Sequence, residues 1–201
     1  MEDLEKQMFA EGDIDFGKLT SKYTMLKIEG KDYAVRTHIY NDDKDKKTLL
    51  MTHGFGMSGC MTAFKIMVPL AEHYRLVIFD HGGFGLNTKI TEKPACALSS
   101  SDASEAYMVE LWKQTVDVMT ENGDLPPKFY LTAHSAGGLY AMLYASFHPE
   151  RIEALFLQSP AGSEEYNEAT YDPYKIRISS TDNFAYPSKK EVDKVIGFLA
   201  D

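Results

Sequence analysis

A serine flanked by small residues offers the clearest chemistry in the chain. The segment AHSAGG at 133–138 follows the apolar run KFYLT and precedes a stretch rich in small residues. A serine at such a strand-to-helix corner has a strained backbone that exposes its hydroxyl, provided that the flanking positions are small. Ala133 and Gly137 meet that requirement, and a helix that starts at Ala136 would direct its N–H groups toward a developing oxyanion. We therefore predict Ser135 as a nucleophile, against the alternative of a serine-glycine turn that begins a buried helix.

A second glycine-rich turn, HGFG at 53–56, follows the apolar run TLLMT. A turn of this kind resembles the other half of an oxyanion hole, in which the N–H of Phe55 would join that of Ala136. We expect the histidine of this turn to shape the backbone and not to act as a base. The residues predicted to support the two turns are His53, Gly54, Gly56, His134 and Gly137.

The same region also fits a dinucleotide-binding pattern. The segment GFGMSG at 54–59 has the G-x-G-x-x-G spacing between a strand and a helix, and Asp80 ends the next strand. This alternative leaves His53 and the AHSAGG turn without a role, and two antiparallel-looking strands would precede its first strand. We keep dinucleotide binding as a minor alternative. If Ser135 is instead the nucleophile, we expect Asp80 to accept hydrogen bonds from local backbone N–H groups.

Apolar runs alternate with amphipathic stretches between residues 48 and 157. Short, wholly apolar strands separated by helices are typical of a parallel sheet that is covered on both faces. The predicted strands are 25–29 and 33–40, which would be antiparallel, then 48–52, 75–79, 128–132 and 152–157. The predicted helices are 58–72, with Met61, Phe64, Met67, Val68 and Ala71 along its apolar face, then 102–120, 136–147 and a last one from residue 188.

The composition fits one cytoplasmic domain. The 201 residues are 44% apolar, which is enough for one buried core, and the net charge of −9 disfavours nucleic acid and anionic membranes as partners. The N-terminus has neither a basic start nor a continuous apolar run, so we expect no signal peptide and no transmembrane segment. The two cysteines lack metal-ligand or redox spacing, so we expect free thiols, no metal and no cofactor.

With these motifs in place, the chain resembles the α/β-hydrolase superfamily over residues 25–160. The segments that carry the resemblance are HGFG at 53–56, FDHGGFG at 79–85, AHSAGG at 133–138 and HPERIEALFLQSPAG at 148–162. They look most like the serine lipase and esterase branch that includes N-acyl-phospholipid lipases and lipid-droplet lipase coactivators. The resemblance implies hydrolysis of a carboxylic ester, with an amide as the second possibility, through an acyl intermediate on Ser135. The substrate would be a small ester or a lipid.

The chain departs from this family where a catalytic acid and a histidine should follow the serine. In the family these residues come after two further strands, and this sequence stops soon after its sixth predicted strand. Beyond Ser135 the sequence has one histidine, His148, which falls at the other end of the predicted helix, ~20 Å away at the rise of an α-helix. Because a serine without a base is a poor nucleophile, we expect little or no activity from these 201 residues alone.

We accordingly expect an incomplete α/β-hydrolase fold, with a mostly parallel sheet of about six strands and helices on both faces. Residues 1–22 would form a lead-in, 23–160 the N-terminal part of the hydrolase core, and 161–201 the beginning of a helical cap. The strand at 152–157 would be an open sheet edge, which is a template for aggregation or for a partner chain that supplies the missing strands. A non-catalytic scaffold that binds a lipid or a protein partner is the second hypothesis.

Overall fold

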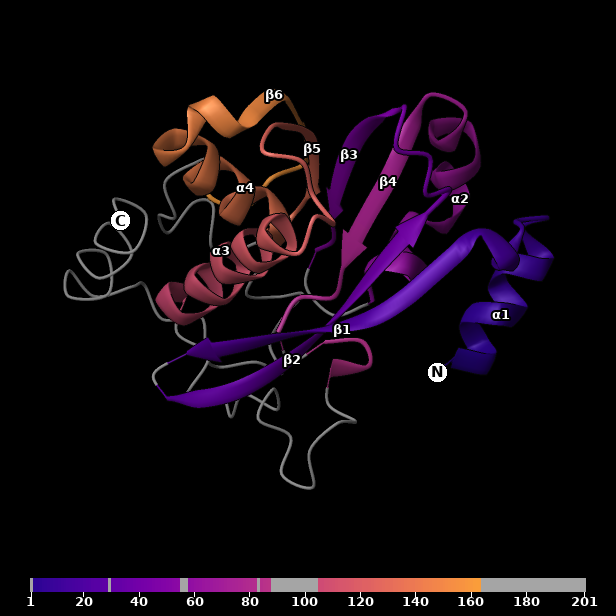
Figure 1. Ribbon diagram of the computed structural model, residues 1–201, viewed down its shortest axis with the longest axis horizontal. Coiled ribbons are helices and arrows are strands. Elements are labelled where there is room, and N and C mark those ends of the chain that lie inside the picture. The colour runs from indigo at the N-terminus through magenta and orange to yellow at the C-terminus, as the bar shows by residue number, and fades with distance from the viewer. Residues whose placement is uncertain (1, 29, 55–57, 83, 88–104, 164–201) are drawn as a thin grey trace, which may run out of the picture.

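The computed structural model describes residues 2–28, 30–54, 58–82, 84–87 and 105–163 of the chain (Figure 1). The strands are β1 (Leu19–Ile28), β2 (Lys31–Tyr40), β3 (Lys47–Thr52), β4 (Tyr74–Phe79), β5 (Phe129–His134) and β6 (Ile152–Gln158). The helices are α1 (Glu2–Glu11), α2 (Gly59–Ala71), α3 (Glu105–Glu121) and α4 (Ala136–Phe147), with 3-10 turns at Phe16–Lys18 and Pro149–Arg151. The helix predicted from residue 188 and the cap expected beyond residue 163 lie outside the described residues.

The six strands form one mixed sheet in the order β1-β2-β4-β3-β5-β6. The β1–β2 hairpin is antiparallel and joins β4 in antiparallel fashion, whereas β4, β3, β5 and β6 run parallel to their neighbours. The predicted fold class is therefore confirmed. One difference is that β1 begins at Leu19, before the predicted start at Met25. The reason is that β1 pairs with β2 along its whole length, from Leu19 opposite Tyr40, although residues 20–23 are exposed and give no apolar alternation.

Helices cover the sheet from both sides (Figure 1). On one side, α3 and α4 pack over a core that includes Trp112, Phe129 and Tyr144. On the other side, α1 and α2 enclose a smaller core that includes Phe9 and Met67. Burial of apolar surface in these two layers fixes which way each strand faces, and thus which strand ends meet at the edge where the two predicted turns lie.

The buried face of α2 is narrower than the sequence predicted. Ala63, Met67 and Ala71 are buried, but Val68 is 41% exposed. Val68 is one residue after Met67, which turns it about 100° away from the stripe that contacts the sheet. The prediction of Val68 as a core residue was therefore wrong.

Within the described part of the chain, β6 pairs with β5 alone and forms one edge of the sheet. Phe156 on this strand is 62% exposed. Ile66 on α2, which lines a small pocket beside β5, is 39% exposed. No helix in the described ranges is long and apolar enough to cross a membrane.

Candidate active site

Ser135 occupies a strained corner between β5 and α4. Its backbone has φ 52° and ψ −119°, a region that residues with a side chain rarely adopt and that costs about 1–3 kcal/mol. The corner is held by hydrogen bonds: the N–H of Ser135 donates to Gln158 O (3.1 Å), while Ser135 O accepts from the N–H groups of Gly138 (2.9 Å) and Ala161 (2.8 Å). The end of β6 and the loop after it therefore fix the conformation in which Ser135 leaves the strand.

Two glycines allow the surrounding turns to approach this corner. A Cβ added to Gly54 would lie 2.9 Å from the Cβ of Ser135. A Cβ added to Gly137 would lie 2.8 Å from Thr52 Oγ1 and still closer to the carbonyl oxygen of His53. Real Cβ atoms do not come so close to other heavy atoms, so both positions require glycine. The small residue two places after the serine is thus needed for contact with the turn after β3.

The start of α4 can supply one of the two predicted oxyanion donors. Ala136 is the first residue of the helix, and among the described residues nothing accepts a hydrogen bond from its N–H or from that of Gly137. The first N–H groups of a helix have no partner within the helix and carry a partial positive charge. Phe55, the other predicted donor, and Gly56 lie outside the described residues.

His53 and His81 form a buried pair behind the serine corner. The N–H of His81 donates to His53 Nε2 (2.8 Å), and His81 Nε2 is 2.6 Å from His53 O. His53 Nδ1 in turn lies 2.6 Å from Gly54 O. The two rings are 4.0 Å apart and almost inaccessible to solvent. Both nitrogens of the His53 ring contact backbone groups, so in this structure the ring shapes the turn.

Asp80 is buried and binds backbone N–H groups. Its Oδ1 accepts from the N–H of Gly59 (2.6 Å) at the start of α2, and its Oδ2 accepts from the N–H of Leu86 (3.4 Å). Burial opposes the charged form, but the neighbouring His38 and the Gly59 N–H outweigh it and lower the pKa of this carboxyl. These bonds occupy the carboxylate that a dinucleotide-binding protein would direct at a ribose, so the geometry does not support that alternative.

A buried ion pair ties the N-terminal helix to this network. Glu5 on α1 is fully buried and contacts Arg36 Nη1 on β2 at 2.8 Å through Oε2. Ser58, which directly precedes α2, donates to Glu5 Oε1 (3.4 Å). Glu5 was not predicted as a buried residue, because the acidic composition of residues 1–22 is typical of a solvated lead-in. One signal was available: Glu5 and Phe9 are four residues apart, on one face of a helix.

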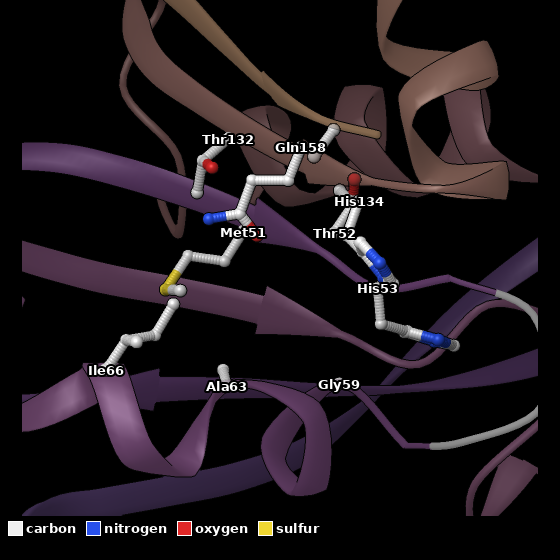
Figure 2. A pocket seen from close by; sticks show the side chains of 10 residues that line it. Met51, Thr52, His53, Gly59, Ala63, Ile66, Thr132, His134 and Gln158 are labelled. Carbon is white, nitrogen blue, oxygen red and sulfur yellow. The ribbon is translucent and has the colours of Figure 1, made fainter. Parts of the chain in front are cut away.

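No imidazole or carboxylate among the described residues hydrogen-bonds the Ser135 hydroxyl. His148 follows α4 at the end opposite to Ser135, where its ring packs on Tyr144. His134 precedes the serine and is exposed. Together with Gln158 and Ile66 it lines a small pocket between β3, β5 and α2 (Figure 2). This pocket lies on the side of the sheet where β6 leaves Phe156 uncovered.

Comparison with known proteins places the chain in a family. The family model for the alpha/beta hydrolase fold matches residues 47–189, well over half of the chain. A mixed sheet with a serine on a strained strand-to-helix corner agrees with that match. The chain therefore belongs to the α/β-hydrolase family.

Several similar curated proteins are named for lipid substrates, others are proline iminopeptidases, and these proteins are longer than this chain. A (lyso)-N-acylphosphatidylethanolamine lipase of Mus musculus is 28% identical over 166 residues, which cover 82% of this chain and 43% of that protein. A 1-acylglycerol-3-phosphate O-acyltransferase of Arabidopsis thaliana is 28% identical over 131 residues, 64% of this chain and 28% of that protein. The crystal structure of a membrane phospholipase A shares the fold, with a TM-score of 0.61 at 18% identity over 99% of this chain and 64% of that one. This chain thus spans less than half of these two curated relatives.

Proposed function

We propose that Ser135 is the nucleophile of an acyl-transfer reaction that hydrolyses a carboxylic ester. The observation that carries this proposal is the positive φ of Ser135 at the junction of β5 and α4, next to the N–H of Ala136, which has no acceptor among the described residues. A strained conformation persists only where surrounding contacts hold it, and such strain is concentrated at functional sites. Here Gly54, Gly138 and Gln158 contact the corner from three different segments.

The reaction would proceed in two steps. Ser135 Oγ attacks the ester carbonyl while its proton passes to a base, and the carbonyl oxygen takes the negative charge beside the N–H groups of Ala136 and Phe55. The tetrahedral intermediate collapses, the base returns the proton to the leaving alcohol, and an acyl-serine remains. Water, deprotonated by the same base, then attacks the acyl group, releases the carboxylic acid and restores the serine.

The base and its acid partner would come from outside the described residues. We infer that a chain segment pairs with the open edge of β6 and carries both groups, whether it belongs to the same polypeptide or to a partner chain. The free edge of β6 and the exposed Phe156 beside it support such pairing. Without a base, the rate from these 201 residues would be lower by a factor on the order of 10⁴ to 10⁶.

A lipid ester is the substrate class that we favour. The relatives named above are a lipase of N-acylated phospholipids and an acyltransferase of a lysophospholipid. An acyl-serine intermediate can serve either reaction, since water or an alcohol can accept the acyl group. We propose hydrolysis as the principal reaction.

Chemical rescue tests this proposal. The 201-residue chain is incubated with p-nitrophenyl butyrate, with and without imidazole as an external base, beside Ser135→Ala and the control Ser146→Ala. Ser146 is an exposed serine on α4 whose hydroxyl donates to Met142 O, so its loss leaves the corner intact. We expect imidazole to accelerate a component that Ser135→Ala lacks and Ser146→Ala retains. Equal rates in all three proteins at every imidazole concentration would contradict the proposed nucleophile.

The second candidate is a non-catalytic scaffold that binds a lipid or a protein partner. It is favoured because no imidazole or carboxylate among the described residues hydrogen-bonds Ser135. Reaction of the protein with N-acylphosphatidylethanolamine, in the presence of any segment that pairs with β6, separates the two candidates, because a scaffold would bind the lipid without releasing fatty acid.

A further inference from the structure

Two histidines from different loops hold each other through backbone groups on both sides. His53 directly follows β3 and His81 lies in the loop after β4. The N–H of His81 donates to the ring of His53, and the ring of His81 contacts the carbonyl oxygen of His53. Because both bonds join the same two residues, neither loop can move without breaking the contact to the other.

This pair also lies against the helix that follows the serine corner. The position of a Cβ on Gly137 is 3.1 Å from His81 Nε2, and it overlaps the carbonyl oxygen of His53. The ring of Tyr140, one turn further along α4, meets that of His81 edge to face with centroids 5.4 Å apart. The pair therefore fills the space between the turn at residues 53–54 and the start of α4.

The hydrogen bonds fix the protonation state of His53 and place a proton on Nε2 of His81. A backbone N–H can only donate, so His53 Nε2 must be the unprotonated acceptor and Nδ1 must carry the proton, which it donates to Gly54 O. The carbonyl of His53 can only accept, so His81 Nε2 carries its proton. A proton added to His53 would sit on Nε2 and would turn the acceptor into a second donor that faces the N–H of His81.

The surroundings of the pair disfavour a positive charge. Burial is the main cause of a lowered pKa at His53, with smaller contributions from His134 and His38, and the carboxylate of Asp80 opposes it. Burial, followed by the proximity of His53, places the pKa of His81 well below its ordinary value. Among the described residues, the phenol of Tyr140 on α4 also faces the pair. The folded protein thus prefers both rings neutral, whereas the unfolded chain would bind protons near pH 6.5.

We propose that His53 and His81 form a proton-sensitive pair that positions the turn at residues 53–54 against the nucleophile corner, and that one proton taken up at His53 Nε2 releases the turn. Gly54 is the residue of that turn that touches Ser135, so release would separate the two halves of the site. The consequence for catalysis rests on the proposed function. The contact and its response to acid do not.

Two measurements on the folded protein test the pair. Nuclear magnetic resonance of ¹⁵N-labelled imidazoles at pH 7.5 should find His53 as the Nδ1–H tautomer and His81 with its proton on Nε2. Amide hydrogen exchange, corrected for the intrinsic effect of pH, should show protection of the His81 N–H that falls about tenfold per pH unit once His53 takes up its proton, below pH 6.5. Protection that stays constant down to pH 4.2, or an Nε2–H tautomer at His53, would overturn the proposal.

Variants separate this effect from general acid unfolding. In His53→Gln the side-chain oxygen can accept from the His81 N–H but does not titrate, so protection at residue 81 should persist to pH 4.2. His73→Gln removes an exposed histidine beyond the far end of α2 and should behave as the unaltered protein. An equal loss of protection in His53→Gln would overturn the proposal. If Ser135 proves inert, the tautomers and the exchange profile should still be as stated, which distinguishes a failure of the proposed function from a failure of the pair.

Discussion

Substitution of Gly137 by alanine tests the close contact between the two turns. In an ordinary helix, glycine to alanine stabilises by about 0.8–1.0 kcal/mol. At Gly137 the new methyl group would overlap the carbonyl oxygen of His53 and lie 2.8 Å from Thr52 Oγ1. The main obstacle is backbone, which cannot rotate away as a side chain can, so we take the upper end of the usual overpacking cost, about 3 kcal/mol. The net expectation is a loss of about 2 kcal/mol.

Thermal unfolding followed by circular dichroism measures this loss. For a chain of this length, about 2 kcal/mol corresponds to a fall in Tm of about 4–8 °C. Ser146→Ala, on the exposed side of the same helix, is the control and should leave Tm unchanged or slightly higher. A Tm of Gly137→Ala at or above that of the unaltered protein would refute the packing of α4 against the turn after β3.

Three further predictions follow from the buried groups and the open edge. Glu5→Ala leaves Arg36 buried without its partner and should lower the free energy of unfolding in urea by about 3–5 kcal/mol. The control Glu11→Ala, at an exposed position, should change it by less than about 0.5 kcal/mol. Similar losses in the two variants would argue against the buried pair. Phe156→Lys should weaken self-association in sedimentation velocity without lowering Tm, and unaltered association would show that β6 is not the contact. The pKa of Asp80 is lowered, so the stability that its carboxylate contributes is present above pH 3.8 and is lost as the pH falls below that value. In Asp80→Asn, the free energy of unfolding should therefore fall less steeply below pH 3.8. The same fall in both proteins would count against the role of the carboxylate.

The parallel part of the fold was predictable because its central strands β3 and β4 are buried on both faces. Their central segments, LLM in β3 and LVIF in β4, are wholly apolar, which is typical of strands in a covered parallel sheet. The start of β1 was not predictable to the same degree. Its segment LTSKYT has one face exposed and carries polar residues on the other, such as Thr24, so the apolar alternation is weak there.

The candidate site was predictable as a set of turns but not as a set of contacts. The strand-turn-helix context around Ser135 follows from local sequence, since small residues stand at 133 and 137 on either side of the serine. That Gly137 is needed for contact with the turn after β3 did not follow from it. The pairing of His53 with His81 depends on the adjacency of β3 and β4, which local sequence does not encode. The burial of Glu5 depends on Arg36, 31 residues away, so a charge pattern alone predicts a solvated helix.

The most direct test of the central claim is to map the residue that a fluorophosphonate modifies. The 201-residue chain is treated with the reagent, with and without added imidazole, and the adduct is located by peptide mass spectrometry. We expect a single adduct on Ser135 that forms slowly alone and faster with imidazole, and that is absent from Ser135→Ala. An adduct on another serine would contradict the assignment of the nucleophile, and rapid modification of Ser135 without imidazole would contradict the expectation that these 201 residues lack its base.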